Sequence, residues 1–207
     1  MFNRKDHILR QKGVLSTEEC NEIITFFETH PELHLEGTIS GRGYTEHNKK
    51  KDTEIVFNTN ADLLGISKFL SGCISQYKKE YPHINKVYFW HMSDTYKVQR
   101  YYPGEGYLDL HCENTGQDFS EEGMGKRILA WMIYLNDVTD GGHTAFPAQN
   151  KKFQPRRGDV LIWPAYFTHP HQGIVSKTQT NILLLVGIIL KNVKIVSSVT
   201  VVLAYIE

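Results

Sequence analysis

Residues 86–190 alternate short runs of aromatic and β-branched residues with turns rich in glycine, proline and aspartate. Such runs are the sequence signal of β-strands, and frequent turns keep each strand short. The predicted strands are Val87–Trp90, Tyr96–Tyr102, Tyr107–Cys112, Arg127–Leu135, His143–Phe146, Asp159–Trp163, Gly173–Val175 and Asn181–Leu190. Short strands with this spacing close into a sandwich or barrel. We therefore expect a mainly β fold with flanking helices, a double-stranded β-helix or jelly roll.

The first 85 residues are predicted to form a helical support region for this core. Ser16 and Glu19 have the spacing of a capping box, which satisfies free amides at a helix start. Apolar residues follow at helical spacing, and Pro31 ends this helix. A second amphipathic helix is predicted from about Ala61 to Glu80. Both helices are expected to pack on the outside of the major sheet.

The charge balance argues against a nucleic-acid partner. Lys+Arg and Asp+Glu both number 23, whereas a nucleic-acid-binding domain carries a basic face. The run Lys49–Lys51 lies among polar residues and is expected to be a solvated loop. Cys20, Cys73 and Cys112 are too few and too irregularly spaced for a disulfide framework, which favours a reducing compartment.

The apolar segments predict neither secretion nor membrane insertion. The N-terminus lacks the long apolar stretch of a signal peptide, so a cytoplasmic location is expected. The apolar run Ile182–Leu190 is too short to span a bilayer, and Lys191 and Lys194 interrupt any longer span. We therefore expect no membrane association.

A split set of three residues indicates a metal site: His111, Glu113 and, much later in the chain, His171. Residues i and i+2 of a strand point to the same face, so His111 and Glu113 can bind one metal while a distant strand supplies the third ligand. Two imidazoles and one carboxylate on one face leave positions of Fe(II) open, which indicates oxygen activation. Cys112 is expected to point to the opposite face, into the core. His169 competes with His171 as the third ligand.

A series of blocks now follows in order: Tyr102-Pro103-Gly104-Glu105-Gly106-Tyr107, His111-x-Glu113, RILAWMIYLN (127–136), GGHTAFP (141–147), RGDVLIW (157–163) and His171-Gln172-Gly173. Together they resemble the Fe(II)/2-oxoglutarate dioxygenases of the prolyl 4-hydroxylase-like superfamily, especially the small forms of bacteria and phages. The resemblance covers about Val14 to Gly173. It implies that His111, Glu113 and His171 bind Fe(II), with His171 preferred over His169 because the family pattern is His-x-Gly.

The resemblance also implies which residues bind the cosubstrate. Tyr102 and Tyr134 match tyrosines that line the 2-oxoglutarate pocket, and Thr144 is a further candidate. The alternative for each tyrosine is a core aromatic. The family places a basic residue about ten positions after the last histidine, where it pairs with the far carboxylate, but this chain has Asn181 there. An unpaired carboxylate in a dry pocket is costly, and Lys177 is the candidate replacement cation.

The sequence after Thr180 departs from the family in composition as well, because the family has a pattern such as Lys-Tyr-Ile-x-x-x-Trp there. The codons ACA AAA TAT ATT ATT ACT GGT TGG encode Thr-Lys-Tyr-Ile-Ile-Thr-Gly-Trp. Deletion of one A gives Thr-Asn-Ile-Leu-Leu-Leu-Val-Gly, which is the sequence from Thr180 to Gly187. One hypothesis is therefore a frameshift after Thr180, with residues 191–207 as an atypical tail. The other is a native buried strand.

The implied activity is hydroxylation of an unactivated C–H bond with Fe(II), 2-oxoglutarate and O2, releasing succinate and CO2, with ascorbate as a candidate reductant. The substrate would be a prolyl or lysyl side chain of a protein, or a small molecule. The loops that would choose it, Gly37–Asp52 and Asn114–Lys126, carry no recognisable substrate signature.

Two alternative functions remain open. Asn181 favours a metal-binding jelly roll that has lost cosubstrate binding and turnover, and the third candidate is a cupin-like module, against which the His-x-Glu…His order argues.

Overall fold

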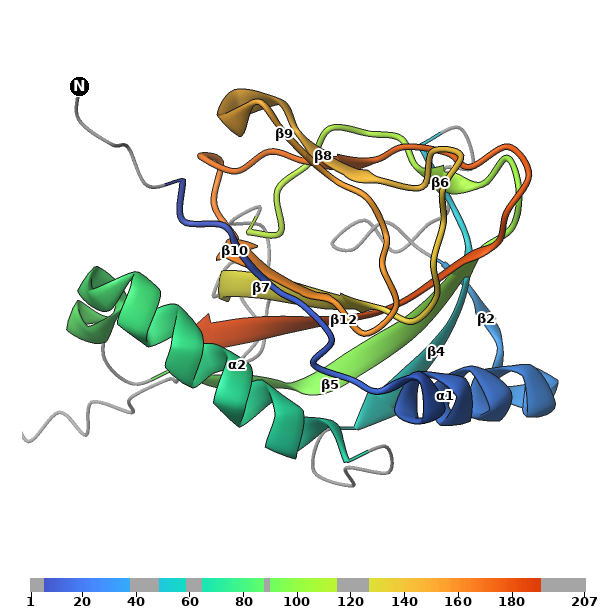
Figure 1. The fold of residues 1–207 in the computed structure, drawn as a ribbon, viewed down its shortest axis with the longest axis horizontal. Helices are drawn as coiled ribbons and strands as arrows, with labels where there is room; N and C mark the ends of the chain where they lie inside the picture. The colour runs from blue at the N-terminus through green and yellow to red at the C-terminus, as the bar shows by residue number, and fades with distance from the viewer. Residues whose placement is uncertain (1–5, 38–48, 59–64, 88–89, 115–126, 191–207) are drawn as a thin grey trace, which may run out of the picture.

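A seven-stranded antiparallel sheet forms the larger layer of the fold, as the computed structural model shows for residues 6–37, 49–58, 65–87, 90–114 and 127–190 (Figure 1). Its strands in spatial order are β1 (Leu9–Gln11), β10 (Val160–Pro164), β7 (Arg127–Tyr134), β12 (Asn181–Leu190), β5 (Trp90–Tyr101), β4 (Thr53–Asn58) and β2 (Leu35–Glu36). A smaller sheet contains β11 (Gln172–Gly173), β8 (Thr144–Phe146) and β9 (Lys151–Phe153). A ribbon of β3 (Lys50–Lys51) and β6 (Gly106–Tyr107) completes the architecture. The predicted jelly-roll class is confirmed.

Two helices cover the face of the large sheet that points away from the small sheet (Figure 1). They are α1 (Thr17–Thr29) and α2 (Ile66–Glu80), with short 3-10 segments at Pro31–Leu33, Pro82–Lys86 and Pro147–Gln149. The Ser16–Glu19 capping box forms as predicted, since Ser16 Oγ accepts from the Glu19 amide at 3.1 Å and Glu19 Oε2 accepts from the Ser16 amide at 2.8 Å. Within the described ranges, we find no helix with the length and apolarity that a bilayer crossing requires.

Side-chain alternation along the strands divides the core into two layers. On β7, Trp131 and Ile133 pack toward the helices, whereas Met132 and Tyr134 pack toward the small sheet. Residues i and i+1 of a strand point to opposite faces, so a strand buried on both sides is apolar throughout. The run Asn181–Leu190 is such a strand, because β12 lies between β5 and β7 in the centre of the large sheet.

The strand boundaries differ from the predictions at several places. The predicted strands Val87–Trp90 and Tyr96–Tyr102 are replaced by one long strand, β5, while Val87 caps a 3-10 segment. Strands β1, β2 and β4 bring the N-terminal region into the same sheet as the C-terminal core, so this region is more than a helical support. The predicted start of the second helix, the larger part of both substrate loops and the tail after Leu190 lie outside the described residues.

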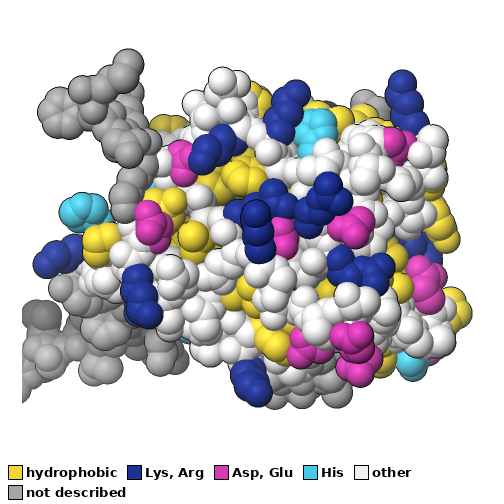
Figure 2. All heavy atoms as spheres, viewed as in Figure 1, with side chains coloured by type: hydrophobic (Ala, Val, Ile, Leu, Met, Phe, Trp, Pro, Cys, Tyr) yellow, Lys and Arg dark blue, Asp and Glu magenta, His cyan; other side chains and the backbone are white. Residues whose placement is uncertain are grey.

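Lys50 contradicts the prediction of a solvated loop at Lys49–Lys51. Its side chain is only 4% exposed, and Lys50 Nζ lies 3.1 Å from Asp52 Oδ1 and 3.4 Å from Glu54 Oε2. Residues 50, 52 and 54 share one face of an extended segment, so two carboxylates compensate the buried ammonium. The alternation of charge with a period of two was the signal that the sequence analysis missed. On the molecular face in Figure 2, Lys and Arg side chains lie directly beside Asp and Glu side chains.

Gly158 connects the large sheet to the N-terminal segment and tolerates no side chain. Its φ is +77°, and a Cβ atom there would lie 2.1 Å from the carbonyl oxygen of Leu15. We expect Gly158→Ala to lower the free energy of unfolding by about 2 kcal/mol or more, through left-handed strain and this overlap. Thermal unfolding measures the effect. Gly72→Ala is the matched control, because Gly72 lies in α2 with open space around it and should gain about 0.5–1 kcal/mol.

Candidate active site

A cavity lies between the two sheets and contains all three predicted metal ligands in its wall. One side is formed by residues of β5, β7 and β12, and the other by residues of β8 and β11. His111, Glu113 and His171 each offer one ligand atom, and these atoms lie within 4.8 Å of one another. The Nε2 atoms of His111 and His171 lie 3.7 and 3.4 Å from the same oxygen, Glu113 Oε1. Three donors therefore converge on one point.

The chain brings the two histidines together by direct backbone pairing. The His111 amide donates to the His171 carbonyl at 3.0 Å, and the His171 amide donates to the His111 carbonyl at 2.8 Å. The predicted strand Tyr107–Cys112 does not form, since only Gly106–Tyr107 belongs to β6 and His111 makes an isolated bridge. Backbone pairing across this bridge, rather than a regular strand, thus sets the spacing of the three side chains.

Second hydrogen bonds orient both imidazole rings. His111 Nδ1 lies 2.8 Å from the Asp109 carbonyl oxygen, and His171 Nδ1 lies 3.1 Å from the His169 carbonyl oxygen. A carbonyl only accepts, so each Nδ1 carries the proton and each Nε2 presents its lone pair to the cavity. This carbonyl–imidazole arrangement is typical of metal-binding histidines.

The protonation states suit a metal cation. Burial alone would raise the pKa of Glu113, but the neighbouring His111 and His171 and the charge of Arg127 hold that pKa well below its usual value. Burial lowers the pKa of His171, which keeps its ring neutral. Two neutral imidazoles and one ionised carboxylate are the donor set that Fe(II) takes in a facial triad, so the three side chains fit this ion.

The neighbouring candidates do not join this cluster. His169 is buried, with Nε2 placed 2.7 Å from the Asp6 carbonyl oxygen and Nδ1 placed 2.9 Å from Thr168 Oγ1. Both ring nitrogens are thus occupied by hydrogen bonds, and the one to Asp6 holds the N-terminal segment. Cys112 is half-buried, and its thiol lies 3.3 Å from the Asn114 carbonyl oxygen. Neither residue belongs to the three-residue group found among the described side chains.

Arg127, which the sequence analysis did not single out, holds the second oxygen of Glu113. Arg127 Nη1 lies 2.7 Å from Glu113 Oε2. Gly187 makes room for this contact, because a Cβ atom at Gly187 would lie 2.7 Å from Arg127 Nε. Partners of this kind orient metal-binding carboxylates.

We expect Arg127→Gln to weaken metal binding by about tenfold or more, because the Glu113 carboxylate loses the group that fixes its orientation. Calorimetric titration with Mn(II), a stable substitute for Fe(II), measures the affinity. Arg156→Gln is the control, since Arg156 is more than half exposed and pairs only with Asp137 at 3.9 Å. Equal affinities for the two variants would contradict the positioning role of Arg127.

Tyr101 rather than Tyr102 is the buried tyrosine of the cavity wall. Tyr101 is 8% exposed, whereas Tyr102 is 46% exposed at the cavity edge with its ring under the Arg100 guanidinium, 4.3 Å away. Gln99 and Tyr101 both line the cavity from β5, as the two-residue period of a strand requires. The two-residue period of the strand was the sequence signal that could have distinguished the buried Tyr101 from the exposed Tyr102.

Thr144 lines the cavity, and Tyr134 lies behind it. The Tyr134 hydroxyl is 2.7 Å from Thr144 Oγ1 and donates to the Phe153 carbonyl at 3.1 Å, so Thr144 donates to Tyr134. Tyr134 is fully buried and belongs to the core layer between the sheets. A contact of Tyr134 with a cavity ligand would therefore be transmitted through the Thr144 hydroxyl.

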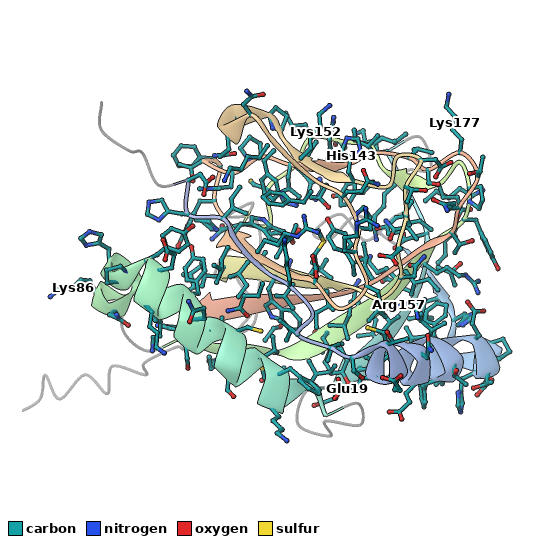
Figure 3. All side chains as sticks on the ribbon, in the orientation of Figure 1. Glu19, Lys86, His143, Lys152, Arg157 and Lys177 are labelled. Atoms are coloured by element: carbon teal, nitrogen blue, oxygen red, sulfur yellow. The ribbon has the colours of Figure 1, made fainter. Side chains whose placement is uncertain are left out.

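Asn181 lines the cavity but brings no charge to it. Its side chain is buried, and Asn181 Nδ2 donates to the Gly142 carbonyl at 3.2 Å. Lys177 is exposed, and in Figure 3 its side chain points outward from the loop that precedes β12. In the described part of the chain, no lysine or arginine lines this cavity. The wall therefore does not fit the far carboxylate of 2-oxoglutarate.

Sequence comparison agrees with the geometry of the cluster. The family model described as the 2OG-Fe(II) oxygenase superfamily matches residues 96–182, a segment that contains all three converging side chains. Over this segment the chain is similar to the prolyl 4-hydroxylases of the 2OG-Fe(II) oxygenase superfamily. A protein of Acanthamoeba polyphaga mimivirus, assigned as a prolyl 4-hydroxylase, is 43% identical over 72 residues. That match covers 32% of this chain and spans only 29% of the length of the viral protein.

Solved structures show the same fold. The viral collagen prolyl hydroxylase of Paramecium Bursaria Chlorella virus-1, solved as a 2OG complex, has a TM-score of 0.66 at 18% identity and covers 89% of this chain and 96% of its own. A prolyl hydroxylase from Trichoplax adhaerens, solved with a hypoxia inducible factor peptide fragment, has a TM-score of 0.67 at 16% identity. The match covers 89% of this chain and 84% of the Trichoplax adhaerens chain.

Proposed function

We propose that this chain is an Fe(II)-dependent dioxygenase of the 2OG-Fe(II) oxygenase superfamily, which hydroxylates an unactivated C–H bond with consumption of a 2-oxo acid. The observation that carries the proposal is the convergence of His111, Glu113 and His171 in a cavity wall, within the segment that matches the superfamily. In the net reaction, substrate R–H, the 2-oxo acid and O2 give R–OH, CO2 and an acid one carbon shorter. Bound iron would supply the activation of O2.

The proposed roles of the protein groups follow from their contacts. His111 and His171 would hold the metal through Nε2 and Glu113 through Oε1, while Arg127 fixes the remaining Glu113 oxygen. The rings of Phe146 and Trp163 lie 5.3 and 5.0 Å from the His171 ring, centre to centre, and exclude water from that side. A dry, oriented site limits side reactions and fixes which bond reacts.

The rim of the cavity supports a polypeptide substrate. The Tyr107 ring stacks on the His111 ring at 3.6 Å, and Leu108 and Leu110, between these cavity-lining residues, are half-exposed. Exposed apolar side chains beside a site mark a surface for binding partners. Two structural neighbours are prolyl hydroxylases by name. We therefore propose a prolyl or lysyl side chain of an extended segment as the substrate.

The proposal is tested by supplying iron, O2, a panel of 2-oxo acids and peptides that contain proline or lysine. Wild-type protein should consume O2 and release CO2, and mass spectrometry should detect a peptide that has gained one oxygen atom. Glu113→Ala should abolish all three signals while the fold remains intact by circular dichroism. Iron binding without O2 consumption for any 2-oxo acid would favour the second candidate, a metal-binding jelly roll without turnover, to which Asn181 and the uncharged wall point.

We propose a frameshift as the origin of Asn181. A frameshift after Thr180 would explain both Asn181 and the apolar composition that follows it. Coding DNA that restores a basic residue at this position in another reading frame would support the frameshift. DNA that gives no family-like continuation in any frame would exclude it and leave β12 as the native strand.

A further inference from the structure

We infer that the cavity of this chain, as it stands, accepts a 2-oxo acid whose far end is uncharged, rather than a 2-oxo dicarboxylic acid such as 2-oxoglutarate. The inference rests on the proposed function and specifies its cosubstrate. It is carried by the polar groups that β5 and β12 present to the cavity, and by the pairing of the surrounding cations.

Asn181 presents a hydrogen-bond acceptor to the cavity. Its amide nitrogen must face the Gly142 carbonyl, because a carbonyl oxygen only accepts. Asn181 Oδ1 is then left buried, without a hydrogen-bond partner among the described residues, in a side chain that is 8% exposed. A buried acceptor without a partner is stabilised by a donor and destabilised by a second acceptor. A ligand carboxylate, which offers only acceptors, is therefore the wrong group for this position.

Gln99, on the strand next to Asn181, has the same polarity. Gln99 Nε2 donates to Asp52 Oδ2 at 2.8 Å and to Glu54 Oε2 at 3.2 Å. Both amide hydrogens are occupied by these two carboxylates, so Gln99 can offer only its carbonyl oxygen to the cavity that it lines. The amide oxygens of Gln99 and Asn181 are thus the atoms that these two side chains have left to offer a ligand.

Five of the described cations near the cavity wall are already neutralised. Each is paired with a carboxylate: Lys50 with Asp52 at 3.1 Å, Lys97 with Glu54 at 2.6 Å, Lys51 with Glu105 at 3.2 Å, Arg127 with Glu113 at 2.7 Å and Arg100 with Glu28 at 2.6 Å. A carboxylate that left water for this wall would find no surplus positive charge among these five residues, and burial of an unpaired anion is strongly unfavourable.

One hydroxyl provides a donor to the same wall. Tyr101 lies opposite Asn181 in the β5–β12 register and lines the cavity. Burial raises the pKa of Tyr101 far above its usual value, so the hydroxyl keeps its proton. The far end of a ligand can accept from this hydroxyl without a charge if it is an ester, and an amide or hydroxyl there can in addition donate to the amide oxygens. The Tyr101 hydroxyl does not replace the charge-assisted pair that a carboxylate requires.

The experiment compares three ligands on the full chain loaded anaerobically with Fe(II): 2-oxoglutarate, its 5-methyl ester and 2-oxopentanoate. The visible charge-transfer band of the iron-chelated keto acid reports binding. The two uncharged acids should bind wild-type protein about tenfold or more tightly than 2-oxoglutarate. In Asn181→Lys this order should reverse, with 2-oxoglutarate gaining about tenfold or more. Asn181→Met introduces an uncharged side chain of about the same length as lysine, and it should leave the order of the ligand affinities unchanged.

The outcomes separate this inference from the proposed function. If wild-type protein binds 2-oxoglutarate as tightly as the uncharged acids, the inference is overturned and the proposed function stands. If Fe(II) itself does not bind, or no 2-oxo acid gives the band, the proposed function fails first and the inference with it. The ranking of the three ligands on wild-type protein decides the question even where Asn181→Lys does not fold.

Discussion

His111→Ala is expected to weaken Fe(II) or Mn(II) binding by more than about 100-fold. The variant removes one of three donors that converge on a single point, and loss of a donor should cost more than the 10–100-fold that loss of an outer partner costs. The ring of His111 lies in the cavity wall rather than in the packed core, so the apo fold should persist. Calorimetric titration with Mn(II), paired with thermal unfolding, measures both quantities.

His169→Ala is the matched control for this prediction. His169 precedes His171 by two residues and is equally buried, but its ring nitrogens contact Asp6 and Thr168. Its loss should lower the free energy of unfolding by about 1–3 kcal/mol, with metal affinity nearly unchanged. The opposite pattern, with binding lost in His169→Ala and kept in His111→Ala, would overturn the assignment of the ligands.

The local features of the fold were predictable where short-range chemistry determines them. The capping box at Ser16 and the apolar periodicity of Arg127–Tyr134 are set by neighbouring residues, and both appear in the structure. The segment around His111 was predicted as a regular strand, but it makes a single bridge to His171. Sequence periodicity cannot report such a bridge, because the pairing joins segments far apart in the chain.

The site shows the same division between what a motif specifies and what packing specifies. The three residues of the cluster are motif residues, and the structure groups His171, and not His169, with His111 and Glu113. Tyr101 and Tyr102 are adjacent aromatic residues that both line the cavity, so only the register of β5 decides which of them is buried in the wall. Arg127 reaches Glu113 because Gly187, on a neighbouring strand, leaves space. The space that one strand leaves for a side chain of the next depends on how the strands pair, and the local sequence does not show this pairing.

Removal of strand β12 is expected to have the second large effect, because this strand lies in the centre of the large sheet. It pairs along its length with β5 on one side and with β7 on the other, and Leu184 is fully buried in the layer beneath the helices. A chain that ends after Thr180 loses the centre of the large sheet and exposes the edges of β5 and β7. We expect it to lose cooperative thermal unfolding and metal binding, since exposed inner edges also promote aggregation.

A chain that ends after Leu190 tests the other boundary of the same element. This shortened chain keeps the whole of β12, Asn181–Leu190, with its pairing to β5 and β7. The free energy of unfolding of the shortened chain should therefore change by less than about 1 kcal/mol, and its Mn(II) affinity should match that of the full chain. Collapse of this longer variant would mean that residues 191–207 contribute to the core. Retained cooperativity in the variant ending after Thr180 would mean that the two outer parts of the sheet fold without their central strand. The pair of chain ends therefore separates a structural role for the apolar strand from any role of the residues that follow it.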